Sequence, residues 1–91
     1  MPDGEIITRK VTVKDKAGLH MRPAAELSRL CQECGGRLRI WKAYASRKEA
    51  VNVQDIMDVL CLNVKSGETL MLEADGRNAG ALLNQACAVL G

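Results

Sequence analysis

Residues 18–25 read Gly-Leu-His-Met-Arg-Pro-Ala-Ala and hold the only histidine of the 91-residue chain, His20. The residues just before this stretch have the character of a turn. After it, apolar side chains recur at helical spacing, at Ala24, Leu27, Leu30, Cys31 and Cys34. Pro23 suits the first turn of a helix, where its missing N–H would have no partner. The stretch therefore predicts a helix that opens with Met21 and Arg22 and has His20 as its N-cap.

A histidine at a helix start sits beside unpaired backbone N–H groups and a partial positive charge of roughly half a unit. Both disfavour a protonated ring, so we expect a neutral His20 with one ring nitrogen free to attack. The same features attract an anion, to which Met21 and Arg22 can offer backbone N–H groups and Arg22 its guanidinium. This arrangement suits a histidine that accepts a phosphoryl group. The residue types alone also fit a simple cap or surface histidine, which is the commoner case.

The octet as a whole resembles the active-site signature of HPr, the histidine-containing phosphocarrier of the bacterial sugar phosphotransferase system. A second block, residues 51–62, reads Val-Asn-Val-Gln-Asp-Ile-Met-Asp-Val-Leu-Cys-Leu and resembles the second helix of that family with its surroundings. The two blocks occur in the family's order and spacing. The resemblance extends from about Val11 to the C-terminus.

Length and composition limit the possible classes of protein. Ninety-one residues suit a single domain, residues 1–91, with a modest core. Trp41 and Tyr44 are the only aromatic residues, so the core should be aliphatic. A net charge of +2 and two aromatics do not indicate nucleic-acid binding. No apolar run is long enough to span a membrane and residues 1–5 do not resemble a signal peptide, so we expect a cytoplasmic protein without membrane insertion.

Four cysteines in a short chain raise the possibility of redox or metal chemistry. Cys31 and Cys34 form a Cys-x-x-Cys, but they fall on the apolar side of the first predicted helix, near its C-terminal end. A redox motif uses the helix N-terminus to stabilise its thiolate, and a zinc site needs further ligands that Cys61 and Cys87 do not supply as a spaced pair. We therefore expect free thiols that serve as small core residues, and no metal site, with a redox or metal protein as the alternative.

Hydrophobic periodicity and turn residues predict seven elements. They are a strand over 7–13, the helix to residue 34 stopped by Gly35 and Gly36, a strand over 37–43, an edge strand over 47–51, a short helix starting within 52–55 and ending near 62, a strand over 69–74, and a helix over 79–90 capped by Asn78. In the second strand Trp41 should point outward, half-buried at a sheet edge rather than exposed as a contact surface.

This βαββαβα order predicts an α+β fold of two layers, with helices on one face of an antiparallel sheet. The resemblance implies the HPr-like open-faced β-sandwich, in which four strands in the order 1-4-2-3 carry three helices on one face.

The resemblance also implies an activity. HPr proteins accept a phosphoryl group on Nδ1 of the histidine from phospho-enzyme I, which phosphoenolpyruvate charges, and pass it to IIA domains. On this chain the acceptor would be His20 and the phosphate-binding groups Met21 and Arg22. The apolar partner-docking surface would consist of Met21, Ile56, Met57 and Leu60. We therefore expect a monomeric carrier that needs no cofactor and is not an enzyme by itself.

Two aspartates depart from the family pattern. Asp55 occupies the position where many members have a serine that a kinase phosphorylates, and its charge imitates part of a phosphate at a helix start. Aspartate is also simply a good residue at that place. Asp58 puts a carboxylate inside the expected docking surface, which should weaken the usual interface or select another partner. The alternative function is therefore a regulatory HPr-like module, similar to the nitrogen-branch carriers, with little or no sugar-transport relay.

Overall fold

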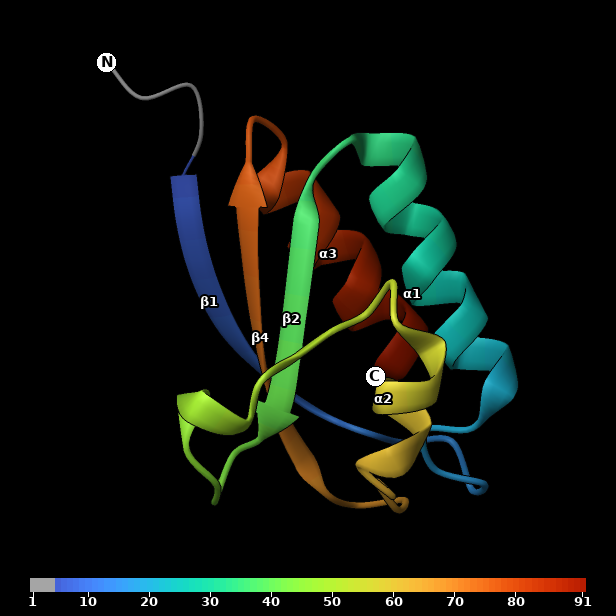
Figure 1. Ribbon diagram of the computed structural model, residues 1–91. Helices are drawn as coiled ribbons and strands as arrows, with labels where there is room; N and C mark the ends of the chain where they lie inside the picture. The colour runs from blue at the N-terminus through green and yellow to red at the C-terminus, as the bar shows by residue number, and fades with distance from the viewer. Residues whose placement is uncertain (1–4) are drawn as a thin grey trace.

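The computed structural model describes residues 5–91, which form a four-stranded antiparallel sheet with three α-helices on one face (Figure 1). The elements in chain order are β1 (Glu5–Thr12), α1 (Met21–Cys34), β2 (Arg37–Lys42), the 3-10 helix η1 (Arg47–Glu49), β3 (Val51–Asn52), α2 (Ile56–Cys61), β4 (Thr69–Gly76) and α3 (Ala79–Leu90). The strands lie in the order β1-β4-β2-β3. The predicted fold class and strand order are confirmed.

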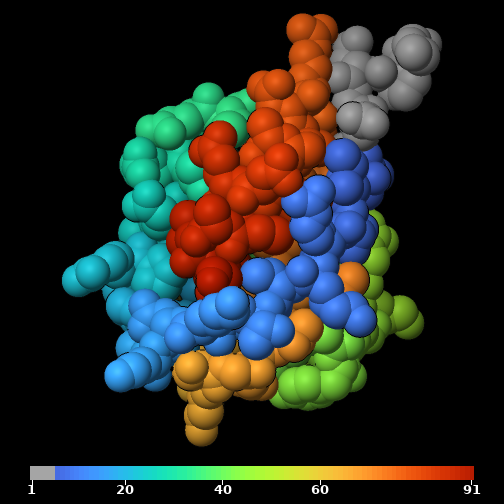
Figure 2. Space-filling model, turned by 180° about the vertical axis from the view of Figure 1, so that it is seen from behind, coloured from blue at the N-terminus to red at the C-terminus, as the bar shows by residue number. Residues whose placement is uncertain are grey.

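The core lies between the sheet and the helices and is aliphatic, as predicted. Alternate residues of β4 supply Leu70, Leu72 and Ala74 to it, all fully buried. The helices contribute Leu27 from α1, Val59 from α2, and Leu82, Leu83 and Ala86 from α3, also fully buried. Each such large side chain stabilises the fold by about 1.5–3 kcal/mol. Seen from the helix side, α3 lies between α1 and β1 (Figure 2).

The two long helices meet where α1 ends. Gly35 adopts a left-handed conformation (φ 71°), and its N–H donates to the Cys31 carbonyl at 2.9 Å, as expected of a glycine C-cap. Asn78 is the N-cap of α3, as predicted, but its side chain makes no capping hydrogen bond. Its side-chain amide instead donates to the Cys34 carbonyl at 3.5 Å, because the end of α1 presents an unpaired carbonyl there.

The predicted third strand over 47–51 is wrong in most of its length. Residues Arg47–Glu49 form η1, and only Val51–Asn52 pair with β2. Ser46 explains the difference, since its side chain accepts the Lys48 N–H (3.1 Å) and its carbonyl accepts the Glu49 N–H (2.8 Å). These local hydrogen bonds compete with the sheet ladder for the same backbone groups.

Trp41 points to the outer face of the sheet, as predicted, but it is only 7% exposed and its strand lies inside the sheet. The prediction of a half-buried edge residue is therefore wrong. Glu73 lies on the same outer face, and Arg47 of η1 binds its carboxylate through two hydrogen bonds of 2.7 and 2.9 Å. This pair holds the segment after β2 against the outer face of the sheet (Figure 1).

The connection from β1 to α1 is docked on the connection from α2 to β4. The Leu19 N–H donates to the Val64 carbonyl at 3.0 Å, and the Leu19 side chain is buried. Gly18 has φ 71°, and a Cβ placed on it would lie 2.3 Å from the Val64 oxygen. Only glycine fits this place, both in conformation and in space.

Replacing Gly18 therefore tests how the loop before α1 is held. Gly18→Ala should combine left-handed strain of about 1–2 kcal/mol with a steric clash of about 1–3 kcal/mol. Gly67→Ala is the matched control, since Gly67 also has positive φ (89°) but open space around it. Urea unfolding should show a clearly larger loss of stability for Gly18→Ala, and equal losses would contradict the proposed tight contact.

Candidate functional site

His20 is the N-cap of α1, as predicted. Its backbone is extended (φ −104°, ψ −168°), and its carbonyl accepts the Ala24 N–H at 3.1 Å. Its side chain is 37% exposed and makes no capping hydrogen bond, so the ring faces solvent instead of closing the helix end. The burial of Leu19 explains this orientation, because successive side chains of an extended segment point to opposite sides.

The first turn of α1 presents anion-binding groups beside this ring. Ala24 is the first residue whose N–H enters the helical ladder, so the N–H groups of Met21 and Arg22 precede it and Pro23 has none. The Pro23 ring is buried, whereas Met21 and Arg22 are exposed. A hollow next to the helix start is lined by Asp15, Arg22, Pro23, Glu26 and Val89. The predicted phosphate-binding residues Met21 and Arg22 thus follow the histidine directly, in the first turn of α1.

Asp15 is a neighbour of His20 that sequence reasoning treated only as part of a turn. Its Oδ2 lies 3.2 Å from His20 Nε2, and its Oδ1 accepts the Ala17 N–H at 2.9 Å. The hydrogen bond from Ala17, followed by that from His20, lowers the pKa of the Asp15 carboxyl. The sequence feature that could have predicted this contact is an acidic residue at the start of a glycine-containing turn that leads into a helix.

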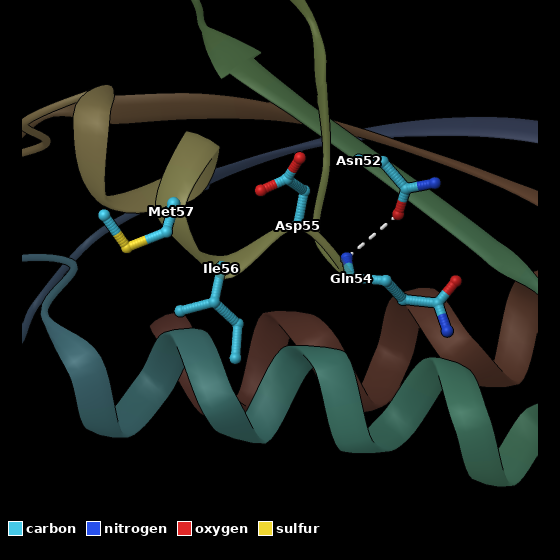
Figure 3. A pocket seen from close by; sticks show the side chains of 5 residues that line it. All are labelled: Asn52, Gln54, Asp55, Ile56 and Met57. Atoms are coloured by element: carbon cyan, nitrogen blue, oxygen red, sulfur yellow. Dashed lines mark hydrogen bonds between the residues drawn. The ribbon is translucent and has the colours of Figure 1, made fainter.

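The four residues of the expected docking surface differ in exposure. Met57 is 67% and Met21 55% exposed, whereas Ile56 and Leu60 are half-buried and pack against the core. They come from the start of α1 and from α2, which pack on each other. In Figure 3 the Ile56 side chain points towards α1 and Met57 lies beside it. The exposed part of this surface therefore consists mainly of the two methionines.

Asp55 is the N-cap of α2, and its side chain accepts the Asp58 N–H at 3.2 Å. The turn before it is also fixed locally, since the Asn52 side chain accepts the Gln54 N–H at 2.9 Å (Figure 3). Hydrogen bonding with the Asp55 side chain, and then repulsion from its charge, raise the pKa of Asp58. Both aspartates are exposed. The capping role of Asp55 is thus sufficient to explain an aspartate at this position.

Cys31, the first residue of the Cys-x-x-Cys, does not have the environment of a redox centre, whereas Cys61 is exposed. Cys31 is buried, and burial raises the pKa of its thiol to about 11, the opposite of the shift that activates a thiol. All four cysteines are free. Within residues 5–91 no group of three or more His, Cys, Asp or Glu side chains is placed to hold a metal ion. None of the helices in the described part of the chain has the length and apolar character needed to cross a membrane.

The chain matches a family of phosphocarrier proteins over most of its length. The family model described as "PTS HPr component phosphorylation site" matches residues 7–91. The phosphocarrier protein HPr of Mycoplasma capricolum is 33% identical over 67 residues, which cover 74% of this chain and 71% of the relative. The phosphocarrier protein NPr of Shewanella violacea is 29% identical over 84 residues, covering 92% and 88%.

Among solved structures, a crystal structure of the phosphocarrier protein HPr from Bacillus anthracis superposes with a TM-score of 0.82. The superposition covers 94% of this chain and 98% of the Bacillus anthracis chain at 24% sequence identity, so the two proteins share the same fold. The chain belongs to the HPr family of phosphocarrier proteins, which work with other proteins of the phosphotransferase system.

Proposed function

We propose that this chain carries a phosphoryl group on Nδ1 of His20, taking it from phospho-enzyme I and passing it to IIA domains in the cytoplasm. The observation that carries the proposal is the solvent-facing imidazole at the N-terminus of α1, two residues before Arg22 and inside a family match that spans residues 7–91. Phosphoenolpyruvate is the ultimate donor in this scheme.

Each proposed role follows from the chemistry of the group. The lone pair of the ring nitrogen attacks phosphorus, and the N–H groups of Met21 and Arg22 with the Arg22 guanidinium bind the phosphoryl oxygens. Met21 and Arg22 are exposed to water, so these groups stabilise the phosphoryl group only moderately. A carrier needs this balance, because tighter binding would slow transfer to the next protein.

The acceptor assignment is tested by incubating the chain with enzyme I and labelled phosphoenolpyruvate. The wild type should gain one acid-labile, alkali-stable phosphate, and His20→Ala should gain none. Tyr44→Ala is a suitable control, since it removes an exposed residue of the loop after β2 and should keep full labelling. Label on the His20→Ala variant would disprove the assignment.

The docking surface is tested by shortening its most exposed side chain. Met57→Ala should reduce kcat/KM for phosphorylation by enzyme I roughly five-fold, since truncating a contributing interface residue costs about 1 kcal/mol or more. Ile6→Ala is the matched control, because Ile6 has the same 67% exposure but lies on β1. Steady-state kinetics should leave the control unchanged, and equal effects of the two substitutions would argue against docking at α2.

A second candidate function is a regulatory carrier of the nitrogen branch. Asp58 supports it, because this exposed carboxylate follows Met57 directly in α2 and would have to be desolvated by an apolar partner surface. The likeness to the Shewanella violacea NPr over 92% of the chain points the same way.

The two candidates are separated by offering the chain both kinds of donor. A sugar-branch carrier should be phosphorylated faster by sugar-branch enzyme I and then pass the label to a IIA domain. A nitrogen-branch carrier should prefer the nitrogen-branch donor, and Asp58→Asn should then improve its acceptance from sugar-branch enzyme I. Normal rates of transfer from sugar-branch enzyme I to the unmodified chain would remove the second candidate.

A further inference from the structure

We propose that Asp15 is a positioning residue that fixes the hydrogen of the His20 ring on Nε2 and so leaves Nδ1 as the attacking nitrogen. The inference rests on the proposed function, since it concerns the residue that would accept the phosphoryl group. It adds a residue from the turn before α1 to a site otherwise built from the helix start.

The geometry defines the direction of the hydrogen bond. His20 Nε2 and Asp15 Oδ2 are 3.2 Å apart, and an ionised carboxylate can only accept. Nε2 must therefore carry the hydrogen. A neutral imidazole has one hydrogen, so Nδ1 keeps its lone pair.

Asp15 can impose this preference because it is itself held in place. Its Oδ1 accepts the Ala17 N–H (2.9 Å), and its carbonyl accepts the Gly18 N–H (2.9 Å). The preceding residue is tied to the end of α3, where the Lys14 N–H donates to the Leu90 carbonyl at 3.0 Å. The lowered pKa of Asp15 also keeps its carboxylate ionised at neutral pH. The turn thus presents one free carboxylate oxygen to the ring.

The same contact helps during transfer. As the bond between Nδ1 and phosphorus forms, the bond from phosphorus to the donor atom of phospho-enzyme I breaks and its electron pair returns to the donor. The His20 ring gains positive charge while its hydrogen stays on Nε2, and the Asp15 carboxylate offsets that charge. The side chains are 37% and 47% exposed, so water screens the interaction and the effect on rate should be moderate.

Two substitutions distinguish positioning from a structural role. In Asp15→Asn the amide oxygen should keep the Ala17 hydrogen bond, which turns the NH₂ group towards Nε2. This group donates, so it favours the tautomer with hydrogen on Nδ1, the wrong one for attack. Asp15→Ala removes the preference without reversing it. We expect phosphorylation by enzyme I to slow roughly three- to ten-fold in Asp15→Asn, and less in Asp15→Ala.

The tautomer is read directly from ¹⁵N NMR of the ring at a pH where it is neutral. Wild type should show a protonated Nε2 and a bare Nδ1, and Asp15→Asn should shift the hydrogen towards Nδ1. Asp75→Asn is a control, since it changes a carboxylate that is paired with Arg37 instead (3.4 Å). Wild-type rate and tautomer in Asp15→Asn would overturn the inference, as would slower transfer with an unchanged tautomer. Absence of label on the wild type would instead refute the proposed function, while the NMR result would still test the hydrogen position.

Discussion

The close approach of Gly18 to the Val64 carbonyl is the constraint on which the site depends. It allows the chain leaving β1 to lie against the loop before β4, so that Leu19 enters the core and its N–H is paired. Because Leu19 points inward, the next side chain, His20, points towards solvent at the start of α1. The reactive group is thus placed by a buried neighbour and a steric limit, while its own side chain takes almost no part in holding the fold.

The side chains that stabilise the fold are separate from those that a partner protein would contact. The groups that hold the structure are the aliphatic side chains between the sheet and the helices, and they lie apart from the groups proposed for chemistry. Met21, Arg22 and Met57 are exposed and can meet a partner without disturbing the packing. The family match and the helix-start geometry support transfer of a phosphoryl group, whereas Asp58 and the likeness to an NPr concern which partner is served.

Much of the fold could be predicted from the sequence because apolar periodicity and glycine turns agree with each other along most of the chain. The helix over 79–90 and the helix start after His20 follow from such patterns, and the strand order came from the family resemblance. The third strand could not be predicted, because Ser46 redirects the backbone hydrogen bonds locally. Trp41 was misjudged because its strand lies inside the sheet, and that position depends on pairing with segments far apart in the sequence.

The site was predictable to the extent that its residues are contiguous. His20, Met21 and Arg22 belong to one helix turn, so spacing alone brings them together. Asp15 meets the ring only because the turn of residues 15–18 folds back, and no periodic pattern reports that contact. The helical spacing in α2 also agrees with the structure, since Leu60 is half-buried against the core and Met57 is exposed.

The buried indole of Trp41, on the outer face of the sheet, can report folding through its fluorescence. Trp41 is the sole tryptophan, and it is only 7% exposed on the face of the sheet away from the helices. Its fluorescence should therefore change when the sheet unfolds and stay the same when only the His20 ring is modified. A variant with changed emission would be unfolded. A variant with unchanged emission but slower phosphorylation would be altered at the start of α1.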